Sequence, residues 1–190
     1  MGSQRSQAVA ETVDVKKRFD NRFTREFGFP KERPATKIKP FLEDRLKDFI
    51  VQSPFLVMAT SSADGSCDAS PKGGKPGFVK IVDDSRIFIP DVAGNRLFQS
   101  YINISENPHI GLVFFIPGVK ETVRVNGRAR ILSHEDVKRL EVELEVHNPD
   151  DVARVLQGLM VEIDESYGHC PRALAFSELW EARADNVGVS

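Results

Sequence analysis

Residues 55–71 read FLVMATSSADGSCDASP and predict a β-hairpin. Apolar and small residues alternate in a strand-like pattern on both sides of Asp64-Gly65, and an Asp-Gly pair favours the tight turn that joins two antiparallel strands. We therefore expect strands over residues 55–62 and 66–71. This hairpin sets the pattern for the rest of the chain, because similar pairs of short apolar segments follow it.

Further strands are expected on the carboxyl-terminal side of this hairpin. A glycine-rich loop at residues 72–77 leads to a second hairpin of similar size, and Pro117-Gly118 joins a third pair of strands. The expected strands cover residues 78–82, 87–90, 110–116, 121–132 and 159–163. Six or seven short antiparallel strands with inserted helices predict a mainly β, α+β domain that forms a closed or nearly closed barrel.

Helical periodicity appears in segments between and around these strands. Apolar residues at helical spacing predict an amphipathic helix between Phe41 and Gln52, and Ser133 is placed to cap another helix. Shorter helices are expected over residues 15–27, after residue 96 and over 171–180. The interpretation divides the chain into an amino-terminal arm (1–40), one barrel domain (41–182) and a tail (183–190).

Composition restricts the classes of function. The 190 residues carry a net charge of -2 and only two cysteines, and no apolar stretch is long enough to cross a bilayer. We expect a cytoplasmic protein without a disulfide framework, a secretory leader or a membrane partner. Residues 1–40 hold ten Lys or Arg against five acids. An RNA-binding barrel that uses this basic arm is an alternative, but the acidic balance of the remainder argues against a nucleic-acid partner.

Residues 90–108, PDVAGNRLFQSYINISENP, combine features of a phosphate site. Gly94-Asn95-Arg96 is expected at a helix entrance, where unpaired N–H groups and partial positive charge favour an anion. Arg96 supplies a forked cation, and Ser100, one turn later, is expected on the same side. The alternative is an ordinary capped helix whose surface arginine pairs only with Asp91.

Side chains elsewhere give little sign of their own catalytic chemistry. The sequence contains no Ser-His-Asp spacing, nucleotide-hydrolase phosphate loop or paired metal-ligand histidines, so neither a catalytic side chain nor a metal site is expected. Cys170 beside His169 favours a buried structural pair over a nucleophile. Arg124 alternates with Val123 and Val125, so it points either to a ligand or to solvent, depending on which face of its strand is inside.

Five stretches, in order and spacing, resemble the pyridoxamine 5'-phosphate oxidase-like, FMN-binding split-barrel family over roughly residues 41–182. The resemblance is closest to a bacterial subgroup of FMN-dependent enzymes of unassigned substrate. The stretches are 58–65 (MATSSADG), 68–79 (DASPKGGKPGFV), 91–112 (DVAGNRLFQSYINISENPHIGL), 117–129 (PGVKETVRVNGRA) and 169–180 (HCPRALAFSELW).

The resemblance implies a six-stranded antiparallel split β-barrel with peripheral helices, assembled as a homodimer with one FMN in each of two sites between the subunits. Carried over to this chain, it implies that the cofactor is bound by Thr60, Ser70, Lys72, Gly73, Asn95, Arg96, Ser100 and Asn103. We add Arg124 as a candidate ligand. Two departures, Gly74 in place of a common aspartate and Phe176 in place of a basic residue, bear on the loop geometry and on the far side of the cofactor.

We therefore expect a flavin oxidoreductase in which FMN carries the chemistry and the protein binds and orients it. Hydride or electrons would pass between NAD(P)H, or another reductant, and an unidentified small-molecule acceptor. The alternative is a non-enzymatic protein on the same scaffold that binds flavin, haem or a deazaflavin, since a fold does not decide function.

Overall fold

The computed structural model describes residues 15–92, 96–140, 144 and 155–181. The chain divides into two compact units, Met1–Ile38 and Lys39–Ser190. In the first unit, three short helices are described: α1 (Val15–Arg18), α2 (Arg22–Phe27) and α3 (Glu32–Thr36). The single helix expected over residues 15–27 is thus two helices, because Asn21 caps the start of α2. Within the described ranges, no helix is long and apolar enough to span a bilayer.

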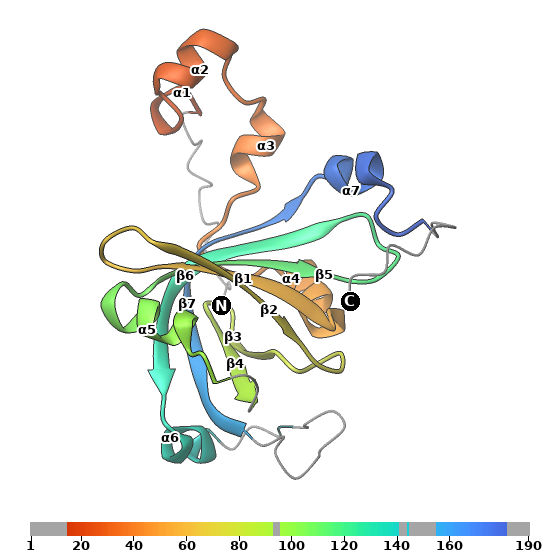
Figure 1. The fold of residues 1–190 in the computed structure, drawn as a ribbon. Coiled ribbons are helices and arrows are strands. Elements are labelled where there is room, and N and C mark those ends of the chain that lie inside the picture. The colour runs from red at the N-terminus through yellow and green to blue at the C-terminus, as the bar shows by residue number, and fades with distance from the viewer. Residues whose placement is uncertain (1–14, 93–95, 141–143, 145–154, 182–190) are drawn as a thin grey trace, which may run out of the picture. The chain divides into compact units, whose positions relative to one another are not determined.

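The second unit is built on one antiparallel sheet, which can be followed by colour in Figure 1. Its strand order is β2-β1-β5-β6-β7-β4-β3. The strands are β1 (Phe55–Ser61), β2 (Cys67–Gly73), β3 (Lys80–Asp83), β4 (Arg86–Val92), β5 (His109–Phe115), β6 (Thr122–Leu132) and β7 (Val155–His169). The helices of this unit are α4 (Asp44–Gln52), α5 (Gln99–Glu106), α6 (His134–Arg139) and α7 (Arg172–Ser177).

The mainly β architecture is confirmed, but the six-stranded barrel is not. In the described part of the chain, seven strands form a sheet that is not closed, with β2 and β3 at its two ends. The first hairpin pairs as expected, with Ser61 opposite Cys67 and Gly65 at a φ of 90°. Ser62 and the backbone N–H of Ser66 donate hydrogen bonds to Asp64, which lower the pKa of its carboxyl group to about 2.

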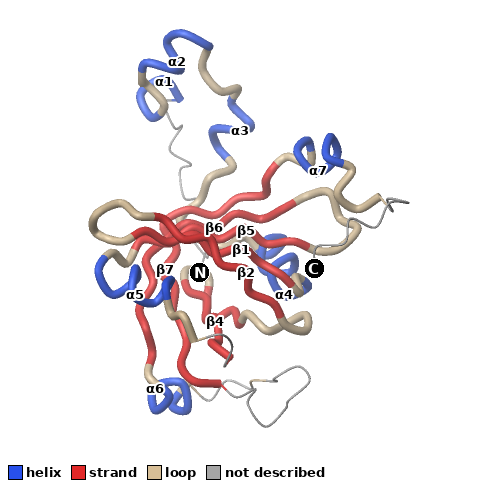
Figure 2. Tube along the Cα trace, viewed as in Figure 1, coloured by secondary structure: helices blue, strands red, loops and turns tan. Residues whose placement is uncertain are grey.

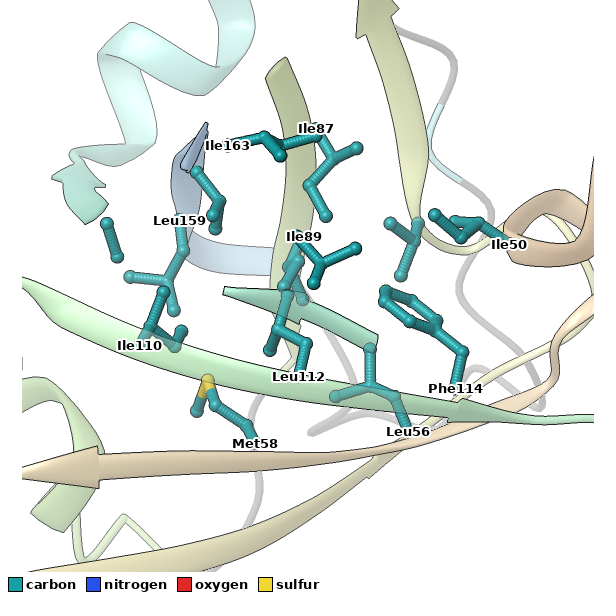
Figure 3. Packing of buried hydrophobic residues seen from close by; sticks show 14 of the residues in the cluster. Ile50, Leu56, Met58, Ile87, Ile89, Ile110, Leu112, Phe114, Leu159 and Ile163 are labelled. Atoms are coloured by element: carbon teal, nitrogen blue, oxygen red, sulfur yellow. The ribbon is translucent and has the colours of Figure 1, made fainter. Parts of the chain in front are cut away.

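Alternation along the strands places one side of the sheet in the core. In β1 and β5, every second side chain is buried, namely Leu56, Met58 and Thr60 in β1 and Ile110, Leu112 and Phe114 in β5. Figure 3 shows the five apolar side chains of this set with Ile87, Ile89, Leu159 and Ile163 of β4 and β7, which belong to the same core. Because β1 and β4 are far apart in the strand order but share this core, the sheet must curve around it.

A bulge in the β6–β7 pair accompanies this curvature. The register shifts between Asn126, opposite Glu165, and Gly127, opposite Ile163, so that β7 contains one extra residue, Asp164. Bulges bend a strand and increase its twist. β7 is also much longer than the expected strand over residues 159–163, since its first half pairs with both β4 and β6 and its second half continues along β6.

The helices of the second unit lie against the sheet or next to strand ends, as Figure 2 shows for α6 beside β7. α4 buries Leu46 and Ile50, in agreement with the amphipathic pattern. Ser133 caps α6 as predicted and forms a reciprocal capping box with Asp136. The expected closing helix is present as α7.

Candidate functional site

A cavity of about 120 Å³ lies beside the edge strand β2. It is bordered by the end of β4, the start of α5 and β7. Its lining residues are Asp68, Ser70, Lys72, Asp91, Val92, Arg96, Leu97, Phe98, Gln99, Ser100, Tyr101 and Leu156. Four of the nine residues predicted to bind the cofactor, Ser70, Lys72, Arg96 and Ser100, therefore come together around one cavity.

β2 supplies three polar side chains to this cavity through simple strand alternation. Asp68, Ser70 and Lys72 are half-buried, whereas the residues between them are exposed. Their cross-strand partners in β1 are the buried Thr60, Met58 and Leu56. Because β2 is an edge strand, its side chains on the core-facing side extend past the packed core and line the cavity. Asp68 was not predicted, although its spacing of two from Ser70 placed it on the same face.

The start of α5 differs from the expectation. The helix begins at Gln99, not at Gly94-Asn95-Arg96, and Gly94 and Asn95 lie outside the described residues. Arg96 and Phe98 both adopt left-handed backbone conformations, with φ of 59° and 53°. Such conformations cost about 1 kcal/mol or more each for residues other than glycine and are concentrated at functional sites. Arg96 and Ser100 thus share the cavity without sharing a helical turn.

The amino-terminal end of α5 has no side-chain cap. A helix end leaves its first N–H groups without intrahelical partners, and these groups carry partial positive charge. Gln99 and Ser100 of the first turn both line the cavity. The end of the helix is therefore suited to an anion.

Buried charges in the cavity are arranged around Asp91. Lys72 Nζ lies 3.9 Å from Asp91 Oδ1, and Gln157 donates a hydrogen bond of 3.2 Å to the other carboxylate oxygen. Tyr101 also hydrogen-bonds Asp91, and burial together with this carboxylate raises the pKa of the Tyr101 hydroxyl group. The alternative in which Arg96 pairs only with Asp91 is not observed, since Lys72 makes the ion pair with this carboxylate. The sequence did not predict that Asp91 and Tyr101 belong to the site. Asp91 was considered only as a partner of Arg96, and Tyr101 only as part of the apolar pattern of the helix.

The remaining carboxylate, Asp68, accepts a hydrogen bond of 2.5 Å from the Ser100 hydroxyl group. Arg96 is exposed and makes no ion pair or side-chain hydrogen bond to the part of the chain that the structure describes. Among the described residues that line the cavity there are two cations and two carboxylates, and of these two cations Arg96 is the one without a carboxylate partner.

Thr60, Asn103 and Gly73 do not line this cavity. Asn103 Nδ2 donates a hydrogen bond of 3.1 Å to Thr60 Oγ1, so these two side chains satisfy each other between α5 and β1. Gly73 ends β2 opposite Phe55. The predicted Asn95 lies outside the described residues, and its contribution stays a prediction.

Arg124 lies on the outer side of β6, opposite the core. Its Nη1 donates a hydrogen bond of 2.9 Å to the Tyr167 hydroxyl group, and the guanidinium carbon lies 5.7 Å from the centroid of the Tyr167 ring. Val123 and Val125 are buried, which fixes the orientation that the sequence left open. Arg124 therefore does not reach the cavity beside β2 within its own chain.

The outer side of the sheet is apolar near β1. Val57 pairs with Pro71 and Val113, while Phe55 and Phe115 place their ring centroids 6.0 Å apart. An open depression of about 550 Å³ on this side is lined by Ala59, Thr60, Ser61, Cys67, Asp68, Ala69, His109, Ile110, Gly111, Asn126, Gly127 and Asp164. Asp68 is among the lining residues of both this depression and the cavity beside β2.

The interpretation of Cys170 and His169 as a buried pair is wrong, because both residues are exposed at the end of β7. The chain turns outward there, before α7. Across the described ranges, no group of three His, Cys, Asp or Glu side chains is arranged to hold a metal ion.

One comparison with known proteins shows the family of the chain. A family model described as pyridoxamine 5'-phosphate oxidase matches residues 42–152, more than half of the chain. No curated protein matches the chain.

Three similar solved structures have TM-scores between 0.44 and 0.49. HupZ of Group A Streptococcus is 18% identical over 67% of this chain and 93% of its own, with a TM-score of 0.49. General stress protein 26 of Bacillus anthracis is 14% identical over 66% and 91%, with a TM-score of 0.44. A Clostridium acetobutylicum protein related to general stress protein 26 is 12% identical over 66% and 85%, also with a TM-score of 0.44.

Proposed function

Because the chain belongs to the pyridoxamine 5'-phosphate oxidase family, we propose that it binds FMN and acts as an FMN-dependent oxidoreductase. FMN, when bound, would accept and donate the hydride or electrons, and the reductant would be NAD(P)H or another small molecule. The observation that carries the proposal is the convergence of Ser70, Lys72, Arg96 and Ser100 on one cavity at an uncapped helix end.

The donor set in this cavity suits the phosphate of FMN. Lys72 and Arg96 supply positive charge, and the hydroxyl group of Ser70 supplies a neutral hydrogen bond. Lys72 neutralises Asp91, and the guanidinium of Arg96 would meet the phosphate as a cation without a carboxylate partner among the described residues. The carboxylate of Asp68 accepts the hydrogen bond of Ser100, and its negative charge would oppose the phosphate, so both cations are needed in this cavity.

We expect Arg96→Ala to weaken FMN binding by about tenfold or more, since one charge-assisted contact contributes ~1.5–3 kcal/mol. Quenching of FMN fluorescence during titration with the apoprotein measures the dissociation constant. Riboflavin, which lacks the phosphate, should bind the variant and the wild-type protein equally.

Arg86→Ala is the matched control, because Arg86 is exposed at the β3–β4 turn and pairs with Asp83 away from the cavity. Equal FMN affinity of Arg96→Ala and wild type would remove Arg96 from the site. An equal loss for FMN and riboflavin would assign Arg96 a structural role.

The same proposal places the flavin between two copies of the chain. A cavity of about 120 Å³ holds only part of a ligand of this size, since small-molecule sites usually measure ~300–1,000 Å³. The apolar outer side of β1, β2 and β5 offers a surface for a second copy, and Arg124 with Tyr167 lies on the same side of the sheet. A partner subunit there would complete the wall of the site.

Substitution of Val57 by glutamate is expected to shift the homodimer towards monomer and to reduce FMN binding in parallel, because it buries a charge at the proposed interface. Multi-angle light scattering at several protein concentrations measures the mass. Val82→Glu is the control, since Val82 is also a partly exposed valine but lies on β3. A wild-type monomer that binds one FMN per chain with full affinity would contradict a shared site.

A visible spectrum of the purified protein separates this proposal from its alternatives. Flavin absorbance that heating releases as FMN, followed by turnover of NAD(P)H with added acceptors, supports the oxidoreductase. Bound flavin without turnover supports a non-enzymatic flavin protein, a Soret band supports haem, and a released deazaflavin identified by mass supports the third alternative.

A further inference from the structure

Helix α2 of the first unit has a defined shape but no buried residue. Asn21 forms a capping box with Thr24 at its start, and the backbone N–H of Gly28 donates a hydrogen bond to the Thr24 carbonyl oxygen at its end. Arg25 adds two contacts of 2.7 Å to the carboxylate of Asp20. None of the residues of α2 is buried. These local bonds hold the helix in shape, and its apolar side chains are left at the surface.

Phenylalanine rings gather on this helix and directly after it. Phe23 and Phe27 are four residues apart and therefore lie on the same face of α2. They are 55% and 77% exposed, and Phe29 is 38% exposed. Single apolar residues are ordinary on a protein surface, but three large rings within seven residues form a patch, and an exposed apolar patch marks a site that binds another molecule.

Positive charge flanks the aromatic segment in the chain. Residues 20–27 are neutral overall, with two arginines and two acids, whereas residues 16–18 (KKR) precede them and Lys31 follows. Residues 1–38 together hold nine Lys or Arg against five acids, and residues 39–190 hold 17 against 23. The excess of cations is thus confined to the first unit. A polyanionic surface would attract this unit and repel the rest of the chain.

Two of the arginines lie over neighbouring rings. The guanidinium carbon of Arg22 is 4.5 Å from the centroid of the Phe23 ring, and that of Arg18 is 5.5 Å from the centroid of the Phe19 ring. Such a pair has an apolar body and a charged tip. At the surface of a bilayer, the ring would be buried beside the acyl chains while the guanidinium stays with the lipid phosphates.

A single-stranded nucleic acid matches these features less closely. Bases stack on open ring faces, and the guanidinium groups already cover one face of the Phe19 and Phe23 rings. The polar side chains of Asn21 and Thr24 are used by the helix cap, so they do not offer hydrogen bonds to bases. A lipid surface requires only apolar area and cations, and both are present.

We propose that the first unit binds the surface of a membrane that contains anionic phospholipids, with Phe23, Phe27 and Phe29 inserted at the boundary between headgroups and acyl chains. Basic segments attract such lipids, and the rings add buried apolar area. No membrane partner was expected, since no apolar stretch can cross a bilayer, but a unit that lies on the surface needs no such stretch. An anchor of this size binds reversibly, and its binding does not depend on the flavin.

Flotation of the full-length protein with lipid vesicles tests this proposal. We expect the protein to float with vesicles of phosphatidylcholine and phosphatidylglycerol in equal parts and to stay in solution with vesicles of phosphatidylcholine alone. Raising the salt concentration to about 1 M should release most of the protein, because the screening length falls to ~3 Å.

Variants separate the contributions of the rings and of the charges. The double variant Phe23→Ser/Phe27→Ser should lower partitioning into the mixed vesicles by about tenfold or more. Arg18→Gln/Lys31→Gln should lower it by about tenfold, since each cation near an anionic surface contributes to the attraction. Phe176→Ser is the matched control, because Phe176 is 74% exposed in the second unit and also has an arginine over its ring, at 5.0 Å.

A tryptophan placed on α2 reports insertion directly. The fluorescence of Phe27→Trp should shift to shorter wavelength when mixed vesicles are added, because the ring enters an apolar environment. Phe176→Trp, with the new tryptophan outside the first unit, should show no such shift. FMN affinity should be the same in all these variants, so that failure of the proposed function leaves this inference standing and the reverse holds as well.

Several results would overturn the inference. Equal flotation with the two kinds of vesicle, or equal flotation of wild type and Phe23→Ser/Phe27→Ser, would show that the unit does not recognise an anionic lipid surface through its rings. If wild type ignores vesicles but binds a single-stranded oligonucleotide that the double variant does not bind, the partner is a nucleic acid. If the double variant changes only the mass measured by light scattering, the rings bind a second copy of the chain.

Discussion

Gly127→Ala is expected to destabilise the second unit by roughly 3 kcal/mol or more, at the upper end of the cost of overpacking a well-packed site. A Cβ built on Gly127 would overlap the carbonyl oxygen of Glu162 in the backbone of β7. Since the added Cβ would meet backbone atoms of β7, no side-chain rotation relieves the overlap. The β6–β7 bulge would have to open, and the pairing that follows it would shift.

Urea denaturation followed by circular dichroism measures this loss. Gly168→Ala is the control in the same pair of strands, because its added Cβ would meet only the flexible end of the Arg45 side chain. We expect the control to stay within about 1 kcal/mol of wild type. Equal midpoints for Gly127→Ala and wild type would show that the close approach at the bulge has been misassigned.

Lys72→Met is expected to weaken FMN binding more than any other single substitution in the site, by about a hundredfold. The substitution removes one cation from the proposed phosphate pocket. It also leaves Asp91 buried without its ion-pair partner, so that two carboxylates face the phosphate with Arg96 as the one remaining cation in the described lining.

The double variant Lys72→Met/Asp91→Asn separates these two effects. Removing the carboxylate should recover part of the lost affinity, because the unpaired negative charge disappears. Fluorescence titration with FMN and with riboflavin measures both variants. If Lys72→Met binds FMN as tightly as wild type, or if the double variant is weaker than the single one, the charge arrangement argued for Lys72 and Asp91 is wrong.

Local sequence signals were sufficient for much of the fold. Asp64-Gly65 located the first hairpin, and the Ser133 cap located α6, because each depends on residues close together in the chain. The full length of β7 was not predicted, since Glu162, Asp164 and Glu165 interrupt its apolar run. That strand is held by pairing with β4 and β6, which no local pattern records.

The number of strands in the sheet could likewise not be predicted from the residues. The pattern allowed six or seven strands, and the family resemblance favoured six. The sheet in the described ranges has seven strands, because β4 of the β3–β4 hairpin pairs with the edge of β7 that does not face β6. β2 and β3 are then left as the two edge strands. Pairing between distant segments decides this arrangement.

Part of the candidate site was predicted through the family resemblance, which named Ser70 and Lys72. The structure shows why they lie together, because strand alternation places them in one row with Asp68. Asp91 and Tyr101 were missed because their roles depend on contacts between β4, α5 and β2. The position of Arg96 was predicted from a helix entrance that lies three residues further on, so its presence at the cavity results from an irregular backbone and not from helical spacing.

The strand order has a thermodynamic consequence. β2 and β3 are neighbours in sequence but form opposite edges of the sheet. The cavity beside β2 is lined by residues of β2 and of β4, and β4 is the neighbour of β3 near the other edge. A ligand in this cavity would bind the folded sheet and not a partly folded one, because β2 and β4 come together only when the strands between them have paired. A bound ligand would then stabilise the fully paired sheet, and the melting temperature of the protein would rise with ligand concentration by mass action.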